Sequence, residues 1–230
     1  METEAFLLAN ITLFQGLSHG ELAAIVRACR NRAFDEGEII VHQGDPGNGL
    51  FLVKSGVVKI ALMAETGQET MVALMSAGDC FGELAVLDGR PRSANATAME
   101  KAECLFLPRD EFLRFLEANP KAMMKIIILL SRRLRYTDEH VGDLVFFDVY
   151  SRIAKKLLEL SESHGVNTKE GLQITLPLTQ QDLADLVGSS RESVNKVMRQ
   201  YRDKGYIAVA NRRIVITDAK NLELRASIHQ

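Results

Sequence analysis

Between Phe34 and Pro108 the chain alternates short apolar stretches with clusters of turn-forming residues. Within the stretches, apolar and polar positions partly alternate, which is the period of a half-buried β-strand. The turn clusters carry glycine, as in GDPGNG at 44–49 and ETGQE at 65–69. The apolar stretches are EIIVHQ, GLFLVKSG, VVKIALMA, ETMVALMSAG and AECLFLP. Short strands separated by glycine turns predict a β-sandwich or jelly roll.

Helical patterns flank the predicted strands on both sides. Ser18 and Glu21 form a capping-box pattern, which predicts the start of a helix through ELAAIVRAC. After the strands, RDEFLRFLEANP predicts a short helix from Arg109. A much longer helical pattern then runs from about Lys121 to Asp148. Strands and helices that are segregated in this way indicate an α+β protein.

The long helix carries a stripe in which residues recur at alternating spacings of 4 and 3, the heptad spacing of a coiled-coil seam. The stripe consists of Met123, Ile127, Leu130, Leu134, Thr137, Val141 and Leu144. The alternative is an amphipathic helix packed on its own β domain. The additional apolar residues of the first turns fit that alternative, and they are Met124, Ile126, Ile128 and Leu129. Further along only the stripe is apolar, so we favour a parallel homodimer.

Residues 179–201, TQQDLADLVGSSRESVNKVMRQY, contain two short helical patterns around a glycine. Thr179 with Asp182 predicts the cap of the first helix, Gly188 the turn, and Ser189 with Glu192 the start of the second. The expected core positions are Leu183, Leu186, Val187, Val194, Val197 and Met198. This arrangement predicts a helix-turn-helix, with an ordinary helical hairpin as the alternative.

The start of the second helix has the side chains of a DNA-reading element. Its residues that face away from the expected core are Ser190, Arg191, Glu192 and Lys196. Arginine and lysine donate to guanine and glutamate accepts from cytosine, so these residues predict a half-site that contains G·C pairs. The residues placed better for phosphates are Thr179, Gln181 and Ser193.

The segment GYIAVANRRIVITD predicts a β-hairpin wing that turns at Asn211 and Arg212. Arg212 and Arg213 are candidates for contact with the DNA backbone, and an ordinary solvated turn explains them nearly as well.

Composition and charge narrow the class of protein. A chain of 230 residues with 47% hydrophobic and 25% charged residues is suited to two globular domains. Residues 149–230 hold 13 Lys/Arg against 9 Asp/Glu, a net charge of +4, whereas residues 1–148 hold 15 against 21, a net of −6. The basic part is a candidate for contact with polyanions.

The cysteines and histidines give no sign of a metal centre, a disulfide framework or an enzyme of the cupin class. The three cysteines are far apart, and the five histidines show no HxH pair. Acidic residues near the N-terminus and the absence of a long apolar run argue against a signal peptide or a membrane span. We therefore expect a soluble, cytoplasmic protein that is not an enzyme and holds no metal.

The stretch CFGELAVLDGRPRSANATA at 80–98 combines an acid, an arginine and a serine within a turning backbone. Gly82 precedes a short helical turn whose N–H groups suit an anion, and Arg92 and Ser93 add donors for the same charge. Glu83 cannot hold an anion but can accept a hydrogen bond from a sugar hydroxyl. These residues indicate a phosphorylated sugar such as a cyclic nucleotide, with a surface pair of Glu83 and Arg92 as the alternative.

The whole chain resembles the cyclic AMP receptor / fumarate-nitrate regulator (CRP/FNR) family of bacterial transcription factors, most closely its cyclic AMP receptor branch. The resemblance rests on FGELAVLDGRPRSA, TDEHVGDLVFFDV and LVGSSRESVNKVM. It implies a cyclic-nucleotide-binding β-roll over 1–117, a dimerisation helix and hinge over 118–148, and a winged helix-turn-helix over 149–230. It also implies cyclic AMP as the effector, a palindromic DNA site, and RNA polymerase as a further partner.

The resemblance also implies roles for individual residues. Glu83 would bind the ribose 2′-hydroxyl, and Arg92 with Ser93 would bind the cyclic phosphate, helped by the backbone of Gly82 and Leu84. Thr137 would contact the purine from the seam, which accounts for a polar residue there. The residues implied to read a TGTGA-type half-site are Arg191, Glu192 and Lys196.

Three features depart from the family pattern. Asp138 stands where serine is usual, and a carboxylate accepts from adenine and guanine alike, so selectivity for the base stays open. Lys196 stands where arginine is usual, which weakens guanine readout. The chain lacks the N-terminal cysteine cluster and the haem-ligand pair of the iron–sulfur and haem sensors. Cyclic GMP or cyclic di-GMP as effector, effector-free DNA binding, and a β-roll enzyme with a protein-docking hairpin remain alternatives.

Overall fold

The computed structural model describes residues 8–9, 11, 13–210 and 213–228. Its contacts divide the chain into two compact units, the first ending at Arg135 and the second beginning at Tyr136. The division falls inside one long helix, α5 (Pro120–Phe146), so this helix contributes to both units. No helix in the described part of the chain is long and apolar enough to cross a bilayer.

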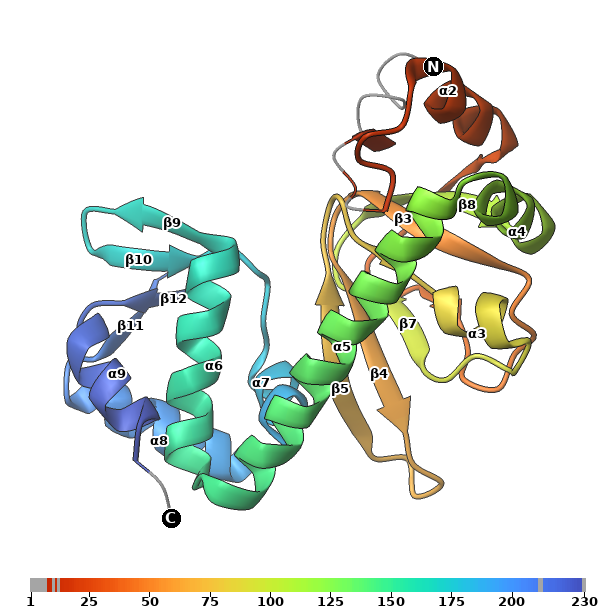
Figure 1. Cartoon of the computed structure of the whole chain (residues 1–230). Helices are drawn as coiled ribbons and strands as arrows, with labels where there is room; N and C mark the ends of the chain where they lie inside the picture. The colour runs from red at the N-terminus through yellow and green to blue at the C-terminus, as the bar shows by residue number, and fades with distance from the viewer. Residues whose placement is uncertain (1–7, 10, 12, 211–212, 229–230) are drawn as a thin grey trace. The chain divides into compact units, whose positions relative to one another are not determined.

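The first unit is built on two antiparallel four-stranded sheets (Figure 1). One sheet has the order β1-β8-β3-β6, with β1 (Arg30–Phe34), β8 (Ala102–Pro108), β3 (Gly49–Ser55) and β6 (Cys80–Phe81). The other has the order β2-β7-β4-β5, with β2 (Ile39–Val41), β7 (Asn95–Ala98), β4 (Val58–Met63) and β5 (Glu69–Met75). The predicted β-sandwich is thereby confirmed.

Alternation along the strands produces two cores. In β3, Leu50 and Leu52 belong to the core shared with the helices, whereas Phe51 and Val53 belong to the core shared with the second sheet. Successive side chains of a strand point to opposite faces, so a strand buried on both sides supplies both layers. In the second core, Phe51 and Phe81 stack with ring centroids 5.1 Å apart.

Three helices cover the outer face of the first sheet. They are α2 (His19–Ala28), α4 (Arg109–Ala118) and the start of α5. The predicted capping box of α2 is present, since the Ser18 side chain accepts from the Glu21 backbone and the Glu21 side chain accepts from the Ser18 backbone. On α5, Ala122 and Ile126 are buried in this core.

The first turns of α5 differ from the expectation. Met124 and Ile128 are exposed and do not pack on the β unit, at 56% and 42% relative accessibility. Leu130, assigned to the seam, packs partly against the core beside Leu129. α5 therefore packs on its own domain with a narrower face than expected. Ala122 and Ile126, which are one turn apart, lie on that face.

The second unit is a winged helix-turn-helix. It contains α6 (Val149–His164), α7 (Gln180–Val187), α8 (Arg191–Asp203) and α9 (Ala219–Ala226). A four-stranded sheet has the order β11-β12-β10-β9, with β11 (Ile207–Ala210), β12 (Arg213–Ile216), β10 (Gly171–Ile174) and β9 (Gly165–Thr168). The predicted wing hairpin is the pair β11 and β12, and β9 and β10 extend it into a sheet.

The end of α5 and the start of α6 meet at Phe147 and Asp148, where the hinge is predicted. α5 ends at Phe146, two residues before the predicted boundary. Asp148 caps α6, and its side chain accepts from the Ser151 backbone N–H at 2.7 Å. Arg225 on α9 pairs with the same carboxylate, so the C-terminal helix helps to fix the first turn of α6.

Candidate functional site

The backbone at Gly82 builds the pocket of the first unit. Gly82 precedes α3 (Glu83–Asp88) and has φ of 84°, in the left-handed region. A Cβ at this position would lie 2.3 Å from Nη1 of Arg92. Glycine is therefore required here both by the backbone conformation and by the approach of the guanidinium. The expected helical turn ELAVL is confirmed as α3.

Arg92 lies buried against this turn, at 4% relative accessibility. Its Nη1 donates to the carbonyl of Gly82 at 2.8 Å, and its Nη2 donates to the carbonyl of Gly49 at 2.5 Å. Its Nε is buried without a hydrogen-bond partner among the described residues. Burial lowers the pKa of Arg92, while Glu83 and Asp45 oppose that change. The guanidinium is thus a desolvated cation with a donor to spare, which is suited to binding an anion.

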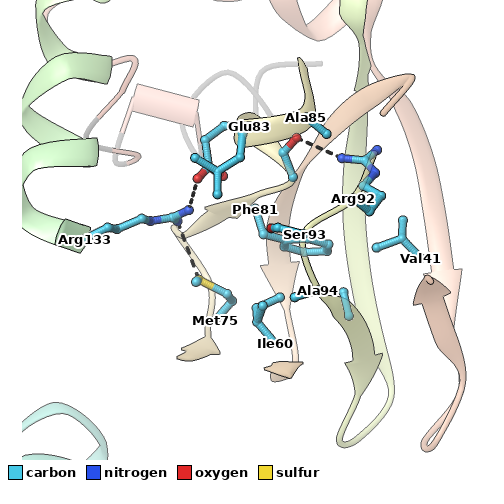
Figure 2. Close-up of a pocket in the computed structure, with 13 residues that line it drawn as sticks. Val41, Ile60, Met75, Phe81, Glu83, Ala85, Arg92, Ser93, Ala94 and Arg133 are labelled. Atoms are coloured by element: carbon cyan, nitrogen blue, oxygen red, sulfur yellow. Dashed lines mark hydrogen bonds and ion pairs between the residues drawn. The ribbon is translucent and has the colours of Figure 1, made fainter. Parts of the chain in front are cut away.

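Glu83 is buried at 1% relative accessibility and pairs with Arg133 of α5 (Figure 2). One carboxylate oxygen accepts from Arg133, and the other, Oε2, has no hydrogen-bond partner among the described residues. Arg133 also donates to the carbonyl of Cys80 and approaches the sulfur of Met75 at 3.9 Å. Burial is the largest single influence and alone would lower the pKa of Arg133, but Glu83, Cys80 and Asp79 together outweigh burial and raise it. The alternative of a surface pair between Glu83 and Arg92 is therefore wrong.

The pocket gathers five of the seven residues predicted to bind the effector. These are Gly82, Glu83, Leu84, Arg92 and Ser93, and they share it with apolar side chains from the second sheet, among them Val41 and Ile60. Figure 2 shows Glu83 and Arg133 pointing toward one another at one end of the pocket. The pocket is partly open and its volume is about 70 Å³. Ligand pockets measure roughly 300–1,000 Å³, so a nucleotide would extend beyond this space unless the lining side chains move.

Thr137 and Asp138 lie on α5 in the second unit and are both exposed. They do not line the pocket of the first unit. Their predicted contact with the base stays a prediction.

Arg133 is the pocket residue that sequence reasoning missed. It follows Arg132 on the same helix, and the helix rotation decides which of the two reaches Glu83. A helical wheel anchored on buried Ile126 would have placed Arg133, seven residues later, on the same face of α5.

The helix-turn-helix follows the predicted pattern except at one cap. Thr179 and Asp182 form the expected capping box of α7, and Gly188 adopts the left-handed conformation of the turn, with φ of 61°. The predicted cap of α8 by Ser189 is wrong, because Ser190 occupies that position and its side chain accepts from the Ser193 backbone. Adjacent serines both fit a cap, and only the length of the turn after Gly188 selects the second.

The residues predicted to contact DNA are placed on α7 and α8 as follows. Those that are exposed are Thr179, Gln181, Ser190, Arg191, Glu192 and Lys196. Ser193 is partly exposed and accepts from the Ser190 hydroxyl at 2.9 Å. The opposite face of α8 is buried through Val194, Val197 and Met198. Arg212 lies outside the described residues.

Comparison with family descriptions matches both units. Residues 31–119 match the cyclic nucleotide-binding domain, and residues 151–225 match the Crp-like helix-turn-helix domain.

Known proteins match nearly the whole chain. The CRP-like cAMP-activated global transcriptional regulator of Mycobacterium tuberculosis is 34% identical over 220 residues, which cover 96% of this chain and 98% of the relative. The cyclic AMP receptor protein of Thermus thermophilus is 33% identical over 211 residues, or 92% of this chain and 94% of the relative.

Solved structures share the fold. The Thermus thermophilus catabolite activator protein has 32% identity and a TM-score of 0.54, over 94% of this chain and 98% of that chain. The c-di-GMP responsive global regulator CLP of Xanthomonas campestris has a TM-score of 0.77 over 86% of this chain and 99% of that chain, at 23% identity. The fold, the two domain matches and the near-complete coverage show that the chain belongs to the CRP/FNR family of DNA-binding, cyclic-nucleotide-binding transcription regulators, a family of transcription factors and not of enzymes.

Proposed function

We propose that this protein is a homodimeric transcription regulator that binds a palindromic TGTGA-type DNA site in response to cyclic AMP. The observation that carries the proposal is the pocket in which Arg92 and Ser93 lie together with the buried carboxylate of Glu83. A cyclic nucleotide requires hydrogen-bond donors for its phosphate and, beside them, an acceptor for a sugar hydroxyl, and this pocket has both. Relatives at 33–34% identity that carry cyclic AMP in their names support this choice.

The ligand would bind polar groups whose hydrogen-bonding capacity is not fully used within the described part of the protein. The buried Nε of Arg92 is free to donate to a phosphate oxygen, and Ser93 would add its hydroxyl. The free Oε2 of Glu83 would accept from the ribose 2′-hydroxyl. The main chain of Gly82 and Leu84 would complete the cradle. Arg133, which binds the other oxygen of Glu83, would keep this carboxylate oriented.

DNA binding would place α8 in the major groove. Arg191 and Lys196 would donate to guanine and Glu192 would accept from cytosine, while Ser190 lies at the start of the same helix. Thr179, Gln181, Ser193 and Arg212 would contact phosphates. A homodimer joined along α5 would present two such helices to half-sites about 34 Å apart. RNA polymerase would be the further partner of the DNA-bound dimer, in the cytoplasm.

The ligand gates the protein only if it binds the DNA-competent state more tightly than the other state. Thr137 and Asp138, on the exposed part of α5, would contact the base and link the pocket to the dimer seam. The carboxylate of Asp138 accepts from the adenine amino group and also from guanine N1–H and N2–H. Cyclic GMP is therefore the second candidate effector.

Fluorescence anisotropy of a TGTGA-N6-TCACA duplex at fixed salt tests the proposal, with no nucleotide, cyclic AMP, cyclic GMP or cyclic di-GMP. We expect cyclic AMP to tighten DNA binding by roughly 5- to 150-fold, the usual range of allosteric coupling. A response to cyclic GMP alone would reassign the effector through Asp138. Equal affinity in every condition would overturn gating and leave an effector-free DNA-binding protein.

The assignment of the phosphate site has its own control. Arg92→Ala and Ser93→Ala should abolish or weaken the response to cyclic AMP, whereas Arg90→Ala, an exposed arginine two residues earlier, should keep it. Arg92 also donates to two backbone carbonyls, so the melting temperature of each variant is compared with that of the wild type. Should Arg92→Ala prove unfolded, the response of Ser93→Ala alone tests the assignment. A full response in both variants would remove the phosphate assignment.

A further inference from the structure

Lys156 on α6 is a buried charge that neither the proposed pocket nor the proposed DNA interface uses. It has 6% relative accessibility. Its ammonium donates to the hydroxyl of Tyr136 on α5 at 2.9 Å and to Glu159 at 2.5 Å. It also lies 5.2 Å from the centroid of the Tyr136 ring, within cation–π range. Burial alone would lower the pKa of Lys156, but Tyr136 and Glu159 outweigh burial and keep the amine charged.

Tyr136 belongs to a second stripe on the last turns of α5. This stripe is Tyr136, His140 and Asp143, at spacings of 4 and 3, and Phe147 follows four residues later, just past the end of the helix. Asp143 pairs with Lys155 of α6 at 2.7 Å, and the same lysine lies 5.9 Å from the Phe147 ring. The stripe is displaced by one residue, or about 100°, from the seam positions Thr137, Val141 and Leu144. One face of α5 thus holds α6, while the seam positions Thr137 and Val141 are exposed on another face.

On α5, the residue that contacts α6 lies close to the residue that contacts the pocket. Arg133, which pairs with Glu83, precedes Tyr136 by three residues, or about one turn. Within one turn, α5 therefore carries Arg133, which pairs with Glu83 in the pocket, and Tyr136, which binds α6.

α6 in turn is bound to the turn and to the second helix of the helix-turn-helix. Arg152 donates to the carbonyl of Gly188, in the turn before α8, at 3.3 Å. Tyr201 of α8 donates through its hydroxyl to the carbonyl of Tyr150 at 2.7 Å. A displacement of α6 relative to α5 would therefore move the recognition helix with it.

We propose that Lys156 and Tyr136 form a latch, a pair of positioning residues that transmits the state of the nucleotide pocket from α5 to the DNA-reading helix through α6. The inference rests on the proposed function, because it names the route by which the ligand acts on DNA binding. The latch touches neither ligand nor DNA. Its role is to make α6 follow α5, so its loss uncouples the two binding events.

Two variants and one matched control test the latch. Tyr136→Phe removes one hydroxyl and keeps the ring, and Lys156→Met removes the charge and keeps an unbranched apolar side chain. Lys220→Met, at an exposed lysine on α9 of the same unit, is the control. The measured quantity is the ratio of DNA affinities with and without cyclic AMP. We expect this ratio to fall at least about threefold in both variants and to stay at the wild-type value in the control.

The reciprocal measurement separates positioning from a merely structural role. Coupling between two binding events is the same in both directions, so the effect of DNA on cyclic AMP affinity must fall by the same factor. A structural role would lower the melting temperature and weaken DNA binding equally with and without cyclic AMP. A wild-type ratio in both Tyr136→Phe and Lys156→Met would overturn the latch.

Hydrogen exchange of residues 144–152 distinguishes failure of the latch from failure of the proposed function. If the wild-type protein shows no dependence on cyclic AMP, gating fails and exchange alone decides about the latch. We expect faster exchange at the hinge in Tyr136→Phe and Lys156→Met and unchanged exchange in Lys220→Met. Wild-type protection in the two latch variants would overturn the proposal in that case as well.

Discussion

At the scale of single residues, the pocket depends on a glycine as much as on its charged side chains. Gly82 lets the guanidinium of Arg92 approach the backbone and lets α3 start from a left-handed residue. Gly89, at the other end of α3, has a similar φ of 72°, but its nearest neighbour to an added Cβ is Nη2 of Arg109 at 3.9 Å. The two glycines therefore share a left-handed conformation that would strain any other residue, and they differ in what a side chain would contact.

This pair gives a prediction for Gly82→Ala with Gly89→Ala as its matched control. Both variants should lose about 1–3 kcal/mol of unfolding free energy, since alanine is strained in the left-handed region. Only Gly82→Ala should also lose cyclic nucleotide affinity, because its Cβ displaces Arg92. Urea unfolding and calorimetry measure the two effects. Equal nucleotide affinity in the two variants would contradict the role given to Gly82.

At the scale of elements, the end of α5 and the start of α6 form a polar interface that contains a histidine. His140 lies half-buried on the Tyr136 stripe, and its Nε2 is buried without a hydrogen-bond partner among the described residues. Burial is the main cause that lowers the pKa of His140, followed by Lys156, with a smaller contribution from Arg152. Asp143 and Glu159 oppose this change. The folded protein therefore favours a neutral imidazole at this position.

The low pKa of His140 predicts that the second unit loses stability in mild acid. Below the ordinary pKa of 6.5 the unfolded chain binds a proton that the folded chain resists, so stability rises with pH in this window and falls on acidification. Urea unfolding at pH 7.5 and pH 5.5 measures the loss, and His140→Gln should reduce it. Asp148, whose pKa is lowered on balance by its hydrogen bonds and Arg225 against burial, loses its contribution only below its ordinary value of 3.8. An unchanged acid loss in His140→Gln would rule out this histidine as the cause.

The elements that sequence predicted are those whose pattern reflects burial on a defined face. The strands β3, β4, β5 and β8 were found because their apolar positions alternate or run continuously. β1 was missed because RNRAF buries only Phe34, and β7 because NATA carries small residues without an apolar pattern. β6 has only two residues and is defined by its pairing with β3.

The dependence on local sequence pattern also explains which residues of the pocket could be predicted. Glu83, Arg92 and Ser93 lie within one short stretch of chain, so their type and order indicated the pocket. The pairing of Glu83 with Arg133 joins residues 50 positions apart and depends on the rotation of α5. The latch is of the same kind, since neither Tyr136 nor Lys156 carries a local pattern that shows their pairing.

At the scale of the whole molecule, the exposed apolar seam of α5 supports the proposed homodimer. Leu134 and Val141 are 63% and 53% exposed, although they lie on the apolar stripe. Val145 and Phe146, near the end of the helix, are 59% and 61% exposed. Val145 and Phe146 lie outside the seam row, whereas Leu134 and Val141 are exposed within it. Exposed apolar residues in one row along a helix indicate an interface, and the heptad spacing of this row fits a parallel pair.

A charge placed in the seam should therefore dissociate the dimer and with it palindrome binding. Val141→Lys places an ammonium among apolar seam residues, whereas Glu139→Lys places the same group at an exposed position outside the stripe. We expect Val141→Lys to be monomeric in sedimentation equilibrium at concentrations where Glu139→Lys and the wild type are dimers. Its affinity for the palindrome should fall by roughly 100-fold or more, because two linked half-site contacts become independent. Its affinity for a single half-site should change little, since α8 is untouched. A dimeric Val141→Lys protein, or a monomer that binds the palindrome as tightly as the wild type, would contradict the assembly along α5.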